Sequence, residues 1–312
     1  MKKYTKIIKI LISLGIMVYL LRLVDFGVVW EQFLELNLFI LILAFLILFF
    51  QCALSSLKWK IILTAESKDI PFLFLMKRYL IGNFISLFLP SSFGGDLYRI
   101  YALGEYNKDY LQNISSVLFD RISGLFALAS ISIISFAFFY KENISYQFFI
   151  AYALAILTFW GLTSSRFIAK LQRTNKKIIS FFNNILESFQ NYRKNVRVLV
   201  LSLAISFWFQ INIVILNHFY CFALNIDLPI TFLFTVIPLV YLTEALPISI
   251  NGLGVREGAF VFFFTQTGVS KEKALALGLL VISIRYIFIM LIGGPLFLKE
   301  ILTSKTTKMC KR

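Results

Sequence analysis

The sequence predicts an all-α polytopic membrane protein, and three observations support this fold class. Hydrophobic residue types make up 59% of the 312 residues and charged types 15%, whereas soluble domains average about 45–50% apolar and about 25% charged. Apolar runs long enough to span a bilayer as helices recur along the whole chain. The longest stretch between these runs, residues 163–197, is too short for a soluble catalytic domain.

Apolar runs of about 20 residues are expected to be full spans. Six runs qualify: residues 7–29, 36–54, 111–140, 146–162, 198–222 and 274–298. Four Lys lie within the first nine residues, at the start of the first run, as in a signal peptide, but no small-x-small cleavage site follows, so we expect an uncleaved first helix. Two more apolar stretches, 72–103 and 230–266, are broken by Pro and Gly, and we expect re-entrant hairpins there. Counting these hairpins as spans gives eight helices.

The net charge of +15 raises the question of whether nucleic acid, an acidic partner or a membrane surface balances it. Cations concentrate at the N-terminus, in residues 163–197 and in the tail, whereas the loop at 23–36 has none. Lys58, Lys60 and Lys68 fall in the connection after the second run. The positive-inside rule then predicts a cytoplasmic-membrane protein with both termini inside. The anionic inner leaflet accounts for most of the charge, and nucleic acid is not needed.

This topology requires the hairpin at 72–103 to enter from the cytoplasmic side and the hairpin at 230–266 from the outer side. Lys271 and Lys273 then lie outside, which mildly violates the rule. A single membrane domain is expected, with residues 1–162 and 198–312 as its halves. The basic segment 163–197 between them has an apolar stripe at helical spacing. It fits an amphipathic helix on the inner leaflet or a plain connector folded against the bundle, with a calmodulin-like target as a remote third reading.

Metal and nucleotide chemistry receive no support from the residues. The three Cys are scattered, no CxxC occurs, and His218 is the only His. A zinc site or a disulfide framework is therefore not expected. No Walker motif is present, which argues against ATP as the direct energy source. We expect no cofactor and no metal.

The two interruptions share the pattern L-P-x-S-x-x-G-x-x-x-R, at residues 89–99 and 246–256, separated by 157 positions. Paired broken segments in two halves are typical of inverted-repeat transporters. Pro ends one half-helix, Gly permits the turn, and the next half-helix offers free N–H groups to an anion. Arg99 and Arg256 lie within a turn of those helix starts and are expected to bind phosphate. The remaining candidates in the motifs are Pro90, Ser92, Gly94, Gly95, Pro247, Ser249, Asn251, Gly252 and Gly254. Surface turns with snorkelling Arg side chains are the alternative.

Charged residues within the apolar runs need a partner or a role, because charge is costly in a bilayer. In the first half, Asp96 can pair with Arg99 or cap its helix. Asp120 and Arg121 are adjacent and point in different directions. Arg121 can reach a lipid phosphate or neutralise Asp96 or Glu244.

Three charged residues of the second half are also candidates. Glu244 fits a proton or cation carrier, or the counter-ion of Arg256 or Arg285. Glu257 follows Arg256 at a helix start, where an acid is favoured in any case. Arg285 lies inside the last span and is expected to face the bundle.

Four motifs stand out along the chain: Gly82-Asn83, Gly94-Gly95-Asp96-x-x-Arg99, Asp120-Arg121-x-x-Gly124 and Pro247-x-Ser249-x-Asn251-Gly252-Leu253-Gly254-x-Arg256-Glu257. In the order of these motifs and in length, nearly the whole chain resembles the flippase-like transmembrane family that includes the membrane domain of lysylphosphatidylglycerol synthase. The resemblance implies a helical domain with re-entrant elements that moves a charged lipid between leaflets. One departure is Asn251-Gly252, where the family usually has Gly-Gly. Because the sequence ends at Arg312, we expect it to lack the synthase's aminoacyl-transferase domain.

We therefore expect a flippase-like transporter of a phospholipid or lipid-linked head group carrying an anionic phosphate, and not an enzyme. Two other readings stay open. A membrane-embedded transferase would need carboxylates facing a nucleotide donor, and Asp96 with Asp120 is the only plausible inner-side pair. An accessory protein of envelope lipid or glycan biosynthesis would use its broken helices structurally. Envelope-biosynthesis proteins or a second copy of the chain are the protein partners considered.

Overall fold

The computed structural model describes residues 15–22, 24–34, 36–65, 69–89, 93–139, 185, 187–192, 194–245, 249 and 251–309. The predicted span 146–162, most of the basic segment 163–197, and Pro90, Ser92 and Pro247 lie outside these residues. All regular structure in the described ranges is helical, which confirms the all-α fold class.

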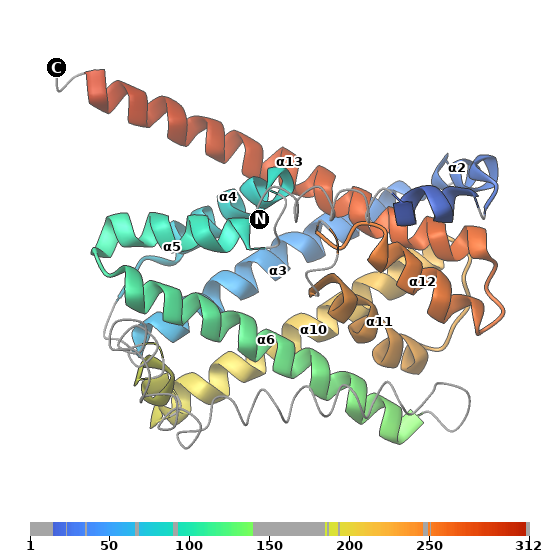
Figure 1. Cartoon of the computed structure of the whole chain (residues 1–312), viewed down its shortest axis with the longest axis horizontal. Helices are drawn as coiled ribbons and strands as arrows, with labels where there is room; N and C mark the ends of the chain where they lie inside the picture. The colour runs from blue at the N-terminus through green and yellow to red at the C-terminus, as the bar shows by residue number, and fades with distance from the viewer. Residues whose placement is uncertain are drawn as a thin grey trace.

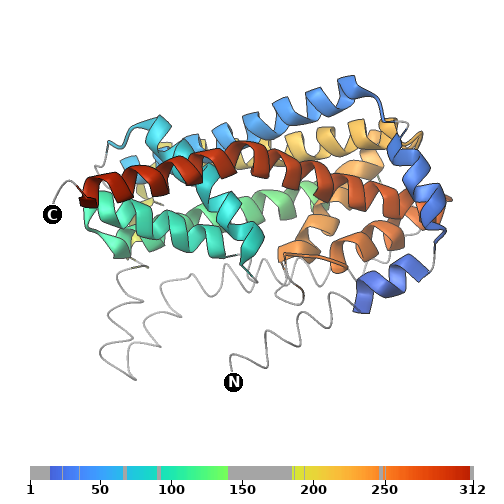
Figure 2. The same cartoon turned by 90° about the horizontal axis from the view of Figure 1, so that it is seen from above.

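The long helices run lengthwise through the molecule (Figure 1, Figure 2). In the described part of the chain, four helices are long and apolar enough to cross a membrane: Leu38–Thr64, Tyr110–Phe136, Val196–Ala223 and Lys271–Thr303. They belong to α3 (Leu38–Thr64), α6 (Tyr110–Phe139), α10 (Val196–Ala223) and α13 (Lys271–Met309). Four of the predicted spans therefore fall on these helices.

Side-chain caps fix where two of the long helices begin. Asn37 Oδ1 accepts from the backbone N–H of Phe39 at 2.8 Å at the start of α3, and Asn195 Oδ1 accepts from that of Val198 at 3.3 Å at the start of α10. The end of α3 was predicted wrongly, because the helix continues past residue 54 to Thr64. Lys58, expected in a connection, is therefore a buried helical residue.

The first predicted span, 7–29, is not continuous. The described helical residues reach Arg22, and a separate helix, α2 (Phe26–Leu34), follows within the segment expected to be a loop. Asp25 Oδ1 accepts from the backbone N–H of Gly27 at 2.8 Å, so the acid starts a new helix. The predicted boundary at residue 29 was wrong because apolar composition alone does not indicate that a new helix, α2, begins at Phe26.

Each broken apolar stretch forms two short helices separated by the predicted motif. The first gives α4 (Phe72–Phe88) and α5 (Gly94–Asn107), and the second gives α11 (Ile230–Ala245) and α12 (Val255–Thr265). Figure 1 shows the α4–α5 pair toward one end of the long helices and the α11–α12 pair toward the other. Both interruptions therefore lie beside the long helices.

Helix packing in one half matches that in the other. Helix α4 packs against α13 as α11 packs against α6, and α5 packs against α6 as α12 packs against α13. Helices α3 and α10 pack on each other, and each also contacts both α6 and α13. The pattern of contacts is unchanged when each of α3, α4, α5 and α6 is exchanged with α10, α11, α12 and α13, in that order. The two halves meet where α3 packs against α10.

Small residues permit the closest helix contacts. A Cβ atom added to Gly95 would lie 2.5 Å from the carbonyl oxygen of Gly82, and one added to Gly293 would lie 2.8 Å from that of Leu80. These glycines therefore let α5 and α13 approach the backbone of α4.

Candidate functional site

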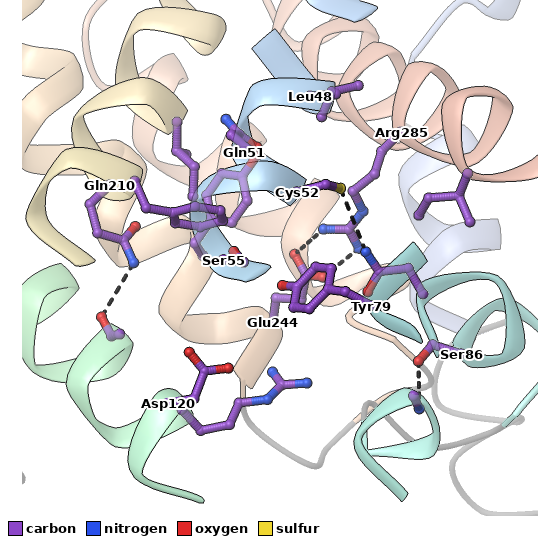
Figure 3. A pocket seen from close by; sticks show the side chains of 18 of the residues that line it. Leu48, Gln51, Cys52, Ser55, Tyr79, Ser86, Asp120, Gln210, Glu244 and Arg285 are labelled. Atoms are coloured by element: carbon purple, nitrogen blue, oxygen red, sulfur yellow. Dashed lines mark hydrogen bonds and ion pairs between the residues drawn. The ribbon is translucent and has the colours of Figure 1, made fainter. Parts of the chain in front are cut away.

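A cavity of about 370 Å³ lies at the centre of the bundle, between the two halves. Its walls come from α3, α4, α5, α6, α10, α11 and α13 (Figure 3). Apolar side chains such as Leu48, Phe209, Ile213 and Phe288 form much of the wall, and charged, amide and hydroxyl side chains also line it. Charged side chains that line a cavity among membrane-spanning helices are typical of a substrate path.

The first charge network joins α3, α5 and α6. Asp96 Oδ1 lies 3.3 Å from Arg99 Nη1, and Asp96 Oδ2 lies 2.7 Å from Arg121 Nε. Asp120 Oδ2 lies 3.0 Å from Arg99 Nη2, and Asp120 Oδ1 lies 2.8 Å from Lys58 Nζ. The two carboxylates are therefore each shared between two cations.

Arg99 is held rigidly within this network. Its guanidinium carbon lies 4.3 Å from the ring centre of Trp59 and 4.7 Å from that of Tyr79. Aromatic rings stabilise a guanidinium through their negative faces. With two carboxylates and two rings around it, Arg99 is a positioned group on the cavity wall.

The second charge network joins α11, α12 and α13. Glu244 Oε1 lies 2.5 Å from Arg285 Nη2, and Glu244 Oε2 lies 3.4 Å from Arg256 Nη1. Arg256 Nη2 also lies 2.6 Å from Glu257 Oε1, and Glu257 Oε2 accepts from the backbone N–H of Gly254 at 2.6 Å. Glu257 thus caps α12 while it neutralises Arg256.

The two networks have the same connections. In each half the motif arginine, Arg99 or Arg256, is buried between two carboxylates. One of these carboxylates, Asp96 or Glu244, also holds a second arginine from the following long helix. That second arginine is Arg121 on α6 or Arg285 on α13, and both line the cavity. Figure 3 shows the Arg285 and Glu244 side chains facing each other across this wall.

The two interruptions meet near the cavity. Ser86 Oγ accepts from the backbone N–H of Gly95 at 2.8 Å, while the carbonyl oxygen of Ser86 accepts from Asn251 Nδ2 at 3.0 Å. Positive φ angles of 51° at Asn251, 77° at Gly252 and 82° at Gly254 form the turn before α12. The first motif is therefore hydrogen-bonded to α4, and the second reaches the same turn of α4 from the other half.

Most predicted site residues are brought together, but not all face the cavity. The cavity wall includes Gly95, Asp96, Arg99, Asp120, Arg121, Glu244, Asn251 and Arg285. Arg256 has 0% side-chain exposure, and it is absent from the wall together with Gly94, Ser249, Gly252, Gly254 and Glu257. Arg256 therefore contacts Glu244 and Glu257 and does not line this cavity.

Sequence reasoning missed several polar wall residues on the core helices. Lys58, Gln51, Tyr79 and Gln210 all line the cavity. Gln51 and Gln210 lie near the middle of α3 and α10, where an amide within an apolar run is a signal that was available. Lys58 was used only to predict topology and was placed in a connection, so its contact with Asp120 was not predicted.

Comparisons with known proteins identify relatives that are membrane proteins. The family model of the lysylphosphatidylglycerol synthase TM region matches residues 6–293. A UPF0104 membrane protein of Methanocaldococcus jannaschii is 26% identical over 221 residues, covering 69% of this chain and 93% of the relative. A UPF0104 membrane protein of Methanothermobacter thermautotrophicus is 25% identical over 262 residues, covering 75% of this chain and 76% of the relative. No solved structure matches the chain. Because the family model covers nearly the whole sequence, the chain belongs to the family of the lysylphosphatidylglycerol synthase TM region.

Proposed function

We propose that this protein moves a lipid with an anionic phosphate head group between the leaflets of the cytoplasmic membrane. The observation that carries the proposal is the central cavity, which both halves line with cationic side chains. Its volume of about 370 Å³ suits a head group, while the acyl chains would stay in the surrounding bilayer. Family membership supports a role in membrane-lipid metabolism.

Arg121 and Arg285 are the proposed head-group contacts. Their side chains are 48% and 28% exposed, whereas those of the Asp96 and Glu244 partners are 9% and 18% exposed. The two arginine side chains are thus more accessible than the carboxylate side chains that they contact. A guanidinium binds phosphate oxygens through parallel N–H groups, which suits this role.

The shared carboxylates allow these arginines to change partner at low cost. When Arg121 turns to a phosphate, Asp96 keeps its contact with Arg99. When Arg285 turns, Glu244 keeps its contact with Arg256. Neither carboxylate is then left buried and unpaired, which would otherwise be strongly unfavourable.

The arrangement of the hairpins supports an inverted repeat with alternating access. The α4–α5 and α11–α12 pairs lie toward opposite ends of the long helices (Figure 1), and the cavity lies between the halves that contain them. In such transporters the site lies at the repeat interface, and each half opens it to one side. Both termini are proposed to be cytoplasmic, and the movement involves no covalent step.

Translocation of a labelled phospholipid in proteoliposomes tests the proposal. We expect Arg121→Gln and Arg285→Gln to lower the initial rate at least about tenfold, since each removes a charged contact of about 1.5–3 kcal/mol. Arg197→Gln is the matched control, because Arg197 is an exposed arginine in the first turn of α10, away from the cavity. If protein-free and protein-containing vesicles translocate the lipid equally fast, the proposed function is wrong.

A further inference from the structure

The described wall of the cavity carries one positive charge more than it carries negative charges. Among the described wall residues, four are cationic and three are carboxylates. The cations are Lys58, Arg99, Arg121 and Arg285, and the carboxylates are Asp96, Asp120 and Glu244. The Arg256–Glu257 pair behind the wall adds no net charge. A net charge surrounded by apolar helices is unfavourable unless a counter-charge enters, so the cavity is matched to a ligand with a single negative charge.

The extra charge is Lys58. Apart from it, each half contributes two arginines and two carboxylates with the same connections. Lys58 Nζ lies 2.8 Å from Asp120 Oδ1 and also donates to the carbonyl oxygen of Asp120 at 2.9 Å and to Ser206 Oγ at 3.2 Å. These contacts fix the ammonium group where α3, α6 and α10 meet.

A second, independent feature indicates a hydrogen-bond acceptor on the ligand. Gln51 is 8% exposed and lines the cavity one and two turns of α3 before Ser55 and Lys58 (Figure 3). Its Nε2 group is buried and meets no acceptor in the described part of the chain. Buried donors are normally paired, so rotation of the Gln51 side chain toward the cavity would give this unpaired donor a ligand oxygen as its acceptor.

We infer that the cavity selects a single phosphodiester with one negative charge, that Lys58 sets this charge requirement, and that Gln51 donates to a phosphodiester oxygen. The inference rests on the proposed function in taking the ligand to be a lipid head group. Lys58 acts here through the charge of the cavity, whereas Gln51 contacts the ligand. The two residues therefore have separable effects on binding.

Equilibrium binding to the full chain in detergent micelles, measured by native mass spectrometry, tests the inference. The probes are phosphatidylglycerol, with one net negative charge, and phosphatidylcholine, with none, carrying identical acyl chains. The unmodified protein should prefer phosphatidylglycerol. Lys58→Gln should reduce this preference about tenfold, the ratio expected when one unit-charge interaction across the cavity is lost.

Matched variants separate cavity charge from the Lys58–Asp120 ion pair. Lys60→Gln removes a charge from the same helix but outside the cavity wall, and should leave the preference unchanged. Lys58→Gln combined with Asp120→Asn restores the original net charge without the ion pair, and should restore the preference. Lys58→Arg keeps the charge and should also keep the preference. If the double variant is as unselective as Lys58→Gln alone, the charge assignment is overturned.

The Gln51 contact has a different signature. Gln51→Leu removes the donor but no charge. It should therefore weaken the binding of both lipids several-fold and leave the ratio of their two affinities unchanged. Unchanged affinity for both lipids would overturn the Gln51 assignment. Inorganic phosphate is added in a separate arm and should not displace phosphatidylglycerol. Displacement with the same dependence on Lys58 would identify a free anion as the ligand and overturn the lipid assignment.

Binding and movement are measured separately, so the two proposals fail separately. If the charge series behaves as expected while no labelled lipid is translocated in vesicles, the proposed function fails and the binding inference stands. If lipid is translocated but the preference for phosphatidylglycerol over phosphatidylcholine does not depend on the charge at Lys58, only the binding inference fails.

Discussion

The side-chain amide of Asn251 donates to the backbone carbonyl of Ser86 at 3.0 Å and so joins the two interrupted hairpins. Ser86 also accepts from the backbone N–H of Gly95 through its hydroxyl, at 2.8 Å. One turn of α4 is therefore bonded to its own hairpin partner and to the turn of the other half. We interpret this contact as the link that keeps the two breaks at the same depth beside the cavity.

Substitution of Asn251 should reveal the two roles of this residue. Asn251→Gly keeps the positive φ of 51° accessible but loses the hydrogen bond, and should cost about 1 kcal/mol of stability. Asn251→Ala loses the bond and also strains the backbone, so we expect about 2 kcal/mol or more. Denaturation in increasing SDS provides the measurement. Equal losses for the two variants would contradict a role for backbone conformation.

Gly95 should tolerate no side chain. The Cβ of Gly95→Ala would lie 2.5 Å from both the carbonyl oxygen of Gly82 and the hydroxyl oxygen of Ser86, and overpacking of this kind typically costs about 1–3 kcal/mol. Gly258→Ala is the control, because the added Cβ would lie 4.0 Å from Leu20 Cδ1, an ordinary van der Waals contact, and alanine favours a helix by about 1 kcal/mol. The two substitutions should shift the thermal unfolding temperature in opposite directions.

Arg256 and Arg285 share Glu244 but should behave differently. Arg256→Gln leaves Glu257, whose side chain is 0% exposed, without its cation, and loss of one partner of a buried pair costs about 3–5 kcal/mol. Arg285→Gln leaves Glu244 paired with Arg256, so the stability loss should be much smaller while translocation falls. Stability and translocation rate measured on the same preparations check this. Equal destabilisation by both variants would contradict the division between support and ligand contact.

Helices α6 and α11 are joined by polar side-chain contacts, whereas the equivalent pair, α13 and α4, is in close contact through a glycine, Gly293. Ser135 Oγ lies 2.8 Å from Thr235 Oγ1, and Ser132 Oγ donates to the carbonyl oxygen of Thr235 at 3.0 Å. A double-mutant cycle with Ser135→Ala and Thr235→Val should give a coupling energy of about 0.6 kcal/mol, typical of hydrogen bonds between membrane helices. The cycle is measured by SDS denaturation. Strict additivity would show that the contact between the Ser135 and Thr235 hydroxyl groups adds no stability.

Local patterns were sufficient for much of the fold. Four long helices overlap predicted spans, and helices α4 and α11 begin at residues 72 and 230, where the two broken stretches were predicted to begin. The spacing of Asp96 and Arg99 offered either a pair or a cap, and the structure pairs them. These features follow from length, apolar content and helical periodicity, each of which is written in a short window of sequence. The helix boundary at Asp25 was missed because the prediction rested on the average apolar content of residues 7–29, whereas a single capping side chain determines where the new helix begins.

The sequence by itself determined the membrane class, the positions of the breaks, and the charged residues that had to find partners. Only the tertiary structure decided which arginine faces the cavity. Arg99 and Arg256 occupy the same motif position, yet Arg99 reaches the cavity wall and Arg256 does not. Tertiary packing also turned Lys58 from an expected loop cation into the odd charge beside Asp120. The physical reason is that exposure and net local charge depend on helices far apart in the chain, and no local spacing encodes which of them meet.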